Sequence, residues 1–500
     1  MRALRNLAVA VLALFPLVGC QQEQAGRMEM AAADVVMVMP VTSSSEAAME
    51  TFMEGQHAMD MGRFVDANEH FRRAVEQDPE FCMAYLRIAN TAPSLEEFRT
   101  NLQTAADFAE GASEAERLMV DINQKGFENN VEGQLDSAER LVEIEPTSPR
   151  AWLTLAGIQT ALGQIAEGRA SMVRATELAP ELVPAYVQLA NSYVFSDPKD
   201  FTRAAENAQK AVDLAPDEPM PHDILGDVYR AQSELEQARD AYTRAAELDP
   251  TNGLPLQQRG HVNSFLGDYE QARADYDAAI ALGTPNEKAQ YPVYRALVSV
   301  HAGDPQAAID ELNELVGAID GMGAPNARGF KIFALQTAAN IAIHHRIIPA
   351  AEHAIQEASA LMMEQAEEAG TDQFRRAQLA NIALFEGWLA AYRGDYATAS
   401  AKARENMAHL EPDQNPRRNE AAHDLMGQIE LLQDNYEAAL AHYEQGNANN
   451  IYMTYMRAVA HEGAGNAVRA RELYETVARN NFNSVGFALV RADAVTKISG

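Results

Sequence analysis

Residues 225–250 read LGDVYRAQSELEQARDAYTRAAELDP and contain two segments in which apolar side chains recur every three or four residues. This spacing places the apolar side chains on one face of each of two helices. Ala238 and Ala245 are small enough to let the two helices pack closely. The stretch ends at a proline that belongs to a series spaced 34, 36 and 34 residues apart, namely Pro146, Pro180, Pro216 and Pro250. A period of about 34 residues predicts a repeated pair of helices.

The spacing of these residues resembles that of the tetratricopeptide (TPR) repeat family. The resemblance covers nearly all of residues 48–482 and implies an all-α fold, a right-handed TPR superhelix (α-solenoid) of about twelve helix pairs. One pair cannot bury its apolar face alone, so neighbouring pairs stack into a continuous core. The positions that carry the match in the quoted stretch are Leu225, Gly226, Tyr229, Ala238, Tyr242, Ala245 and Pro250.

The regularity of the pattern predicts how the chain is divided. Two regions depart from the repeat: residues 90–130, where Ala92-Pro93-Ser94 breaks the phase, and residues 317–329, where glycines and a proline cluster and favour a hinge. The predicted parts are a lipoprotein signal peptide (1–19), a flexible tether (20–45), an N-terminal TPR array (46–316), the possible hinge (317–329), a degenerate C-terminal TPR array (330–482) and a capping helix (483–500).

The N-terminus has the composition of a secretory signal. Arg2 and Arg5 precede an apolar run over residues 7–18 that is too short to span a membrane. The run leads into Leu17-Val18-Gly19-Cys20, which resembles the lipobox of bacterial lipoproteins. In that family the cysteine is acylated after cleavage, so the resemblance implies a lipid anchor at Cys20. An ordinary secretory signal with an incidental cysteine is the alternative.

The lipobox resemblance implies a place for the protein in the cell. A lipoprotein of this kind is attached to a membrane of the bacterial cell envelope and faces the periplasm. Gln21 follows the cysteine where an aspartate would retain the protein at the inner membrane of enteric bacteria. We therefore expect the outer membrane.

The charge of the chain restricts its partners. The formal net charge is −32, and removal of the signal peptide with its two arginines makes it −34. Nucleic acids and anionic lipid surfaces need a face rich in lysine and arginine, so they are poor partners. Basic proteins or peptides are favoured instead.

No motif for chemistry is present. The sequence contains no GxxxxGK[ST] loop, HExxH, GxSxG or paired CxxC motif, and we therefore expect neither enzyme activity, a cofactor nor a metal. The densest histidine group, His344, His345 and His353, is expected to flank a turn between helices. Cys82 is expected to be a small buried apolar residue.

The best candidate for a functional site is geometric. In TPR proteins the first helix of each pair lines a concave groove, and the matching positions here carry polar side chains that suit an extended peptide. The alternative is that these residues are simply solvated. The family's clamp for acidic chaperone tails is not expected, because Val187 occupies the position of its lysine. The candidate groove residues are Gln188, Asn191, Asp223, Asp227, Arg230, Gln257, Gln258 and His261.

The sequence thus favours a lipid-anchored TPR scaffold or adaptor that mediates protein–protein interactions. The alternative is a glycan-binding or polysaccharide-export accessory lipoprotein, in which Trp152, Tyr186 and Tyr193 stack on sugars. That role requires these rings to face the groove, whereas their repeat positions place them in the core.

Overall fold

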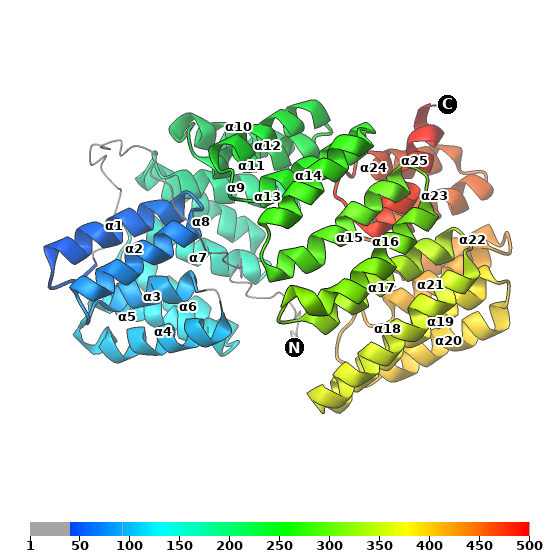
Figure 1. Cartoon of the computed structure of the whole chain (residues 1–500), viewed down its shortest axis with the longest axis horizontal. Helices are drawn as coiled ribbons and strands as arrows, with labels where there is room; N and C mark the ends of the chain where they lie inside the picture. The colour runs from blue at the N-terminus through cyan, green and yellow to red at the C-terminus, as the bar shows by residue number, and fades with distance from the viewer. Residues whose placement is uncertain (1–40, 93, 500) are drawn as a thin grey trace. The chain divides into compact units, whose positions relative to one another are not determined.

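A computed structural model describes residues 41–92 and 94–499, and these residues form 25 α-helices and two short 3₁₀ helices without a β-strand (Figure 1). Helices α1 to α24 form twelve successive pairs, and α25 follows them. The predicted all-α repeat fold is confirmed. The predicted signal peptide, Cys20 and the tether up to residue 40 lie outside the described residues.

The described chain divides into two compact units. The N-terminal unit comprises residues 41–229 and 240–250, and the C-terminal unit comprises residues 230–239 and 251–499. The division falls within α11 (Pro219–Ala231) and α12 (Leu235–Leu248). Residues 317–329, the predicted hinge, lie inside the C-terminal unit, where Ile319 is fully buried. Whether they bend stays a prediction.

The N-terminal unit contains the first ten helices. Their bounds are α1 (Glu46–Asp60), α2 (Phe64–Gln77), α3 (Cys82–Asn90), α4 (Leu95–Phe108), α5 (Glu114–Phe127), α6 (Val131–Ile144), α7 (Pro149–Ala161), α8 (Ile165–Leu178), α9 (Val183–Phe195) and α10 (Phe201–Leu214), with η1 (Ala109–Gly111) after α4.

The C-terminal unit contains the helices that follow α12. Their bounds are α13 (Leu254–Leu266), α14 (Tyr269–Leu282), α15 (Pro285–His301), α16 (Pro305–Ala318), η2 (Ile319–Met322), α17 (Ala327–His344), α18 (Ile348–Ala369), α19 (Asp372–Tyr392), α20 (Tyr396–Leu410), α21 (Glu420–Leu431), α22 (Tyr436–Tyr443), α23 (Ile451–Gly463), α24 (Ala467–Ala478) and α25 (Val485–Ser499).

A contact between glycine and an aromatic ring holds the helices of several pairs together. A Cβ atom on Gly226 would lie 2.5 Å from the ring of Tyr242, and one on Gly427 would lie 2.5 Å from the ring of Tyr443. Both tyrosines are almost completely buried. The glycine of the first helix therefore makes room for the aromatic ring of the second, which explains why the two residue types recur at this spacing.

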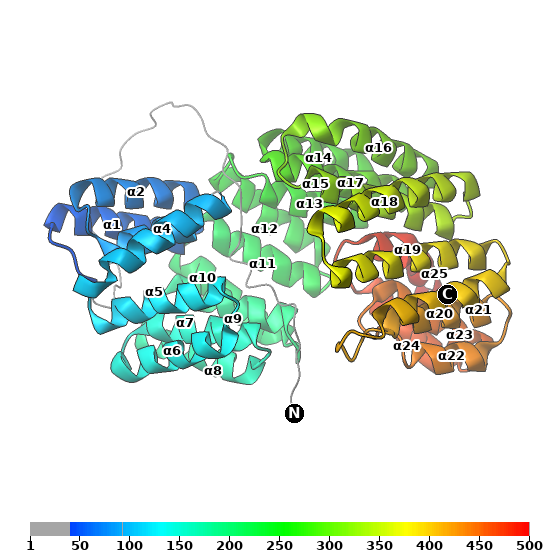
Figure 2. The ribbon, with the colours of Figure 1, turned by 90° about the horizontal axis from the view of Figure 1, so that it is seen from below.

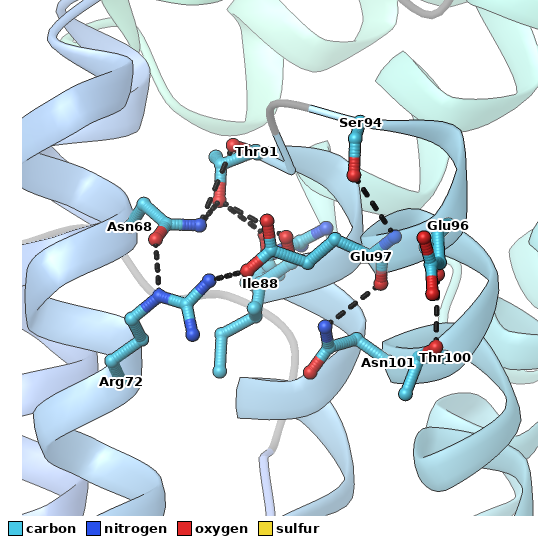
Figure 3. A network of polar contacts seen from close by, with 10 residues as sticks. Asn68, Arg72, Ile88, Thr91, Ser94, Glu96, Glu97, Thr100 and Asn101 are labelled. Atoms are coloured by element: carbon cyan, nitrogen blue, oxygen red, sulfur yellow. Dashed lines mark hydrogen bonds and ion pairs between the residues drawn. The ribbon is translucent and has the colours of Figure 1, made fainter. Parts of the chain in front are cut away.

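The irregular region after α3 is held by side-chain contacts (Figure 3). Arg72 donates through Nε to Asn68 Oδ1 (2.7 Å), and Asn68 donates to Thr91 Oγ1 (2.8 Å). Arg72 also pairs with Glu97 of α4. Ser94 caps α4 by accepting from the Glu97 amide (3.2 Å). Polar contacts thus fix the junction where the repeat phase is broken.

The first helices of successive pairs form one continuous face in the C-terminal unit. Helix α15 contacts α13 and α17. Each later first helix contacts the next one: α17 contacts α19, α19 contacts α21, and α21 contacts α23. The final helix, α25, packs against α15, α17 and α23 as well as against its neighbour α24 (Figure 2). The last helix of the chain therefore covers first helices that lie much earlier in the sequence.

Candidate binding groove of the C-terminal unit

Four of the predicted groove residues form one polar cluster in the C-terminal unit. Arg230 donates through Nη1 to Gln258 Oε1 (3.0 Å), and Gln257 Nε2 lies 3.0 Å from His261 Nε2. Gln258 is partly buried, whereas Arg230, Gln257 and His261 are only 4%, 7% and 5% exposed. These side chains do not form an open, solvated surface.

The chain's own C-terminal segment covers this cluster. Residues 480–484 form no helix and connect α24 to α25. Asn483 donates through Nδ2 to His261 Nδ1 (2.9 Å) and to the Tyr276 hydroxyl (3.4 Å), and its Oδ1 lies 3.5 Å from His301 Nε2. The amide of Asn483 is thus surrounded by side chains of α13, α14 and α15.

Further contacts extend the covered area on both sides of Asn483. Asn481 donates through Nδ2 to Ser233 Oγ (2.8 Å), and the Arg230 guanidinium stacks on the Phe482 ring at 5.0 Å. On the other side Phe487 is fully buried, with its ring centroid 5.3 Å from that of Phe265. The segment from Asn481 to Phe487 therefore contacts the groove through alternating amide and aromatic side chains.

The histidines in this site are neutral at pH 7. Burial, reinforced by Arg230 and His301, holds the pKa of His261 well below its usual range. Burial lowers the pKa of His301 to about 4, although its contact with Asn483 acts in the opposite direction. Neutral imidazole rings offer both a donor and an acceptor, which suits an amide side chain.

The other predicted groove residues belong to the N-terminal unit. Gln188, Asn191 and Asp223 are partly buried there. Asp227 is buried and accepts a hydrogen bond from the Tyr242 hydroxyl (2.7 Å), so it supports a helix pair. Whether any of the eight residues binds a partner stays a prediction.

Arg230, Gln257 and His261 are buried and not exposed along an open face, and whether they bind a partner stays a prediction. The physical reason for their burial is that the polar faces of these repeats bind Asn481, Phe482 and Asn483, which our sequence analysis did not single out. The run Asn480-Asn481-Phe482-Asn483 is the signal that was available. It stands between two helical patterns without the glycine or proline of an ordinary turn.

A second chain of polar contacts, partly buried, runs through the same unit. The Tyr443 hydroxyl donates to Gln428 (3.1 Å), and Gln428 donates to the Tyr392 hydroxyl (3.4 Å). The Tyr392 and Tyr452 hydroxyls are 2.9 Å apart, and the latter lies 2.9 Å from His344 Nδ1. These residues belong to α17, α19, α21, α22 and α23, so the contacts connect four successive helix pairs.

The remaining histidines and the cysteine have structural surroundings. His344 and His345 end α17 and His353 lies in α18, so they flank a turn as predicted. Across residues 41–92 and 94–499, no group of three or more His, Cys, Asp and Glu side chains is arranged to hold a metal. Cys82 is buried, and burial raises the pKa of its thiol to about 12.

The aromatic residues considered for sugar stacking have roles within the repeats. Trp152 donates through its indole nitrogen to the Pro146 carbonyl (3.0 Å), and Tyr186 donates to the Pro180 carbonyl (3.0 Å). Tyr193 is buried beneath the Arg169 guanidinium, which lies 4.4 Å from its ring. The predicted core position is confirmed for Tyr193, whereas Trp152 and Tyr186 are only partly buried.

None of the helices in the described part of the chain is both long and apolar enough to cross a membrane. A family model described as tetratricopeptide repeat matches residues 52–113, 197–253 and 259–323. The first match covers most of α1 and all of α2 to α4, and the other two run from the loop after α9 to the end of α16, with a gap at residues 254–258. No curated protein matches the chain.

Solved structures that are similar include MamA of Desulfovibrio magneticus RS-1, at 18% identity over 34% of this chain and 95% of that one, with a TM-score of 0.31. A thermophilic TPR protein of Thermus thermophilus shows 21% identity over 38% and 98% of the chains, with a TM-score of 0.31. YrrB, described as a TPR protein with an unusual peptide-binding site, shows 15% identity over 40% and 99%, with a TM-score of 0.29. The repeat spacing, the helix pairs and the family match show that the chain contains tetratricopeptide repeats.

Proposed function

We propose that this protein is a lipid-anchored scaffold of the bacterial cell envelope that binds other proteins through extended peptide segments. TPR proteins generally bind proteins or peptides, and their fold is typical of non-enzymatic scaffolds. The observation that carries the proposal is the position of residues 480–484. This non-helical segment of the chain contacts the candidate groove of the C-terminal unit through Asn481 and Asn483.

The chemistry of this groove suits a peptide. Gln257, Gln258 and the neutral ring of His261 offer donors and acceptors that pair with amide groups. Arg230 adds a planar cation that stacks on an aromatic ring. The excess of acidic residues over the whole chain favours partners that carry basic segments.

The proposed attachment to the membrane rests on Cys20 and on the way the following segment joins the fold. Thr42 donates through its amide nitrogen and its hydroxyl to the two oxygens of Glu116, both at 2.7 Å. Glu116 is fully buried at the start of α5. The chain between Cys20 and Thr42 spans at most about 75 Å when fully extended. This length is sufficient for the repeats to stand clear of a bilayer surface and bind soluble partners.

Site-specific photo-crosslinking in cells tests the function. A photoreactive amino acid at Gln258, in the groove, is expected to form adducts with envelope proteins. A second position, Asn191, tests the face of the N-terminal unit. Gln237 is the matched control, because it is exposed on the second helix of its pair. Equal adducts at Gln258 and Gln237, or adducts that protease does not remove, would contradict the proposal.

A further inference from the structure

The segment that covers the groove of the C-terminal unit contacts it through four particular side chains. The contacting residues are Asn481, Phe482, Asn483 and Phe487. They present an amide, an aromatic ring, a second amide and, four positions later, a second aromatic ring. Each of the four meets a different part of the groove, so the groove reads both the residue types and their order.

Asn481 and Asn483 contact the groove through their side chains, and the groove residues that they contact also use their side chains. Ser233, His261 and Tyr276 each contact an asparagine side chain of the segment. The hydrogen bonds described here therefore depend on which side chains the segment carries and not on its backbone. Any peptide that presents the same side chains in the same order has the same partners.

The internal segment is an imperfect occupant. Asn481 is 1% exposed, and its Oδ1 has no hydrogen-bond partner among the described residues. Its backbone has a positive φ of 48°, in the left-handed region that asparagine adopts more readily than most residues other than glycine. A partner peptide whose amide oxygen at this position also finds a donor would form one hydrogen bond more than the internal segment does.

We propose that residues 481–487 occupy the groove in place of a partner, and that the partner carries a peptide with the order amide, aromatic, amide in a non-helical segment and, four residues later, a second aromatic residue in the first turn of a helix, as in α25. The inference rests on the proposed function, since it identifies the class of peptide that the same groove binds. The partner displaces the internal segment, so the resting protein is self-occupied. A tethered segment has a high effective concentration and lowers the apparent affinity for any free peptide.

The test uses the full chain and a fluorescent synthetic peptide, RNNFNSVGFALV, which copies residues 479–490. The tail variant, Phe482→Ala with Asn483→Ala, weakens the internal segment and leaves the groove residues intact. We expect this variant to bind the peptide at least about tenfold more tightly than the wild type in fluorescence anisotropy. The matched control is Thr496→Ala, an exposed change on α25 that is expected to bind as the wild type does.

Peptide controls test the order of side chains. A scrambled peptide, and one with alanine at the positions of Phe482 and Asn483, are expected not to bind the tail variant. Equal binding of the scrambled peptide would overturn the inference. So would a tail variant that has wild-type helicity by circular dichroism and yet binds the peptide no better.

A second measurement applies if the tail variant loses helicity. Hydrogen–deuterium exchange is followed in the wild-type chain with and without saturating peptide. The amides of residues 481–487 are expected to exchange faster when peptide is present, and unchanged exchange would overturn the inference. Failure of crosslinking to envelope proteins alongside normal peptide binding would count against the proposed function alone.

Discussion

Gly226 and Gly157 both lie in the interior of a first helix, yet their surroundings are opposite. A Cβ on Gly226 would overlap the ring of Tyr242, whereas one on Gly157 would meet no atom within 4 Å. Glycine in a helix interior is unfavourable relative to alanine because it loses more backbone entropy on folding. Only at Gly226 does packing compensate for that loss.

The two glycines are therefore expected to respond in opposite directions to the same substitution. Gly226→Ala should lower the free energy of unfolding by about 1–3 kcal/mol, because the added methyl group displaces a buried ring. Gly157→Ala should raise it by about 0.5–1 kcal/mol. Both residues belong to the N-terminal unit, so urea unfolding followed by circular dichroism compares them directly. Midpoints that shift in the same direction would contradict this account of the repeat glycine.

The stability of the C-terminal unit should depend on pH through the carboxyl group of Asp424. Both of its oxygens lie 3.2 Å from the amide nitrogen of Asn447, and burial raises its pKa to about 7. Between pH 4 and pH 7 the folded chain holds a proton that the unfolded chain has released. The contribution of Asp424 to stability therefore falls as the pH rises across this range.

Asp424→Asn should remove this contribution, because asparagine keeps the acceptor oxygen and carries no charge. We expect the variant to match the wild type near pH 4 and to exceed it at pH 8 by on the order of 2 kcal/mol. Thermal unfolding at a series of pH values measures the difference. Parallel curves for the two proteins would show that the carboxylate is not the cause.

At the scale of helices, a buried ion pair connects α1 to α7 over 90 positions of sequence. Arg150 donates through both terminal nitrogens to the two oxygens of Asp60, at 3.0 Å and 2.5 Å. Both side chains are nearly buried. Next to this pair Arg87 donates to Gln56 of α1 (3.0 Å), so three first helices of the N-terminal unit are joined by polar contacts.

Loss of the ion pair should be costly because it leaves one buried charge without its partner. Arg150→Ala is expected to lower the free energy of unfolding by about 3–5 kcal/mol. Arg140→Ala is the control in the same unit, since its pairs with Glu114 and Glu143 are exposed to solvent and should contribute little to stability. Comparable losses in the two variants would argue against the importance of the link between α1 and α7.

The comparison of Gly226 with His261 shows what the sequence could predict at this scale. Gly226 contacts Tyr242, which lies 16 positions away within one repeat, so the requirement recurs in each unit and appears as a pattern. His261 contacts Asn483, which lies 222 positions away and occurs once. Such a contact leaves no periodic signal. The helix pairs were therefore predictable, but the covering of the groove was not.

At the scale of the whole molecule, the proposed attachment to a membrane rests on the N-terminus. The helices of the described residues include none that could span a bilayer, and the acidic chain is repelled by anionic lipid. Thr42 donates two hydrogen bonds to the buried Glu116. An anchor on the residues that precede Thr42 would therefore also attach the folded repeats. Of the two cysteines, Cys82 is buried and Cys20 belongs to the lipobox-like stretch.

The two cysteines provide a matched pair of variants. Cys20→Ser should move the protein from the membrane fraction to the soluble fraction, because the thiol that would carry the lipid is lost and a firmly held anchor needs more than one acyl chain. Cys82→Ala should leave the protein with the membranes. Labelling with an alkyne-tagged fatty acid should mark the wild type and Cys82→Ala but not Cys20→Ser. A Cys20→Ser protein that still needs detergent for release would place the attachment elsewhere in the chain, and fatty-acid labelling of that variant would exclude Cys20 as the lipid-bearing residue.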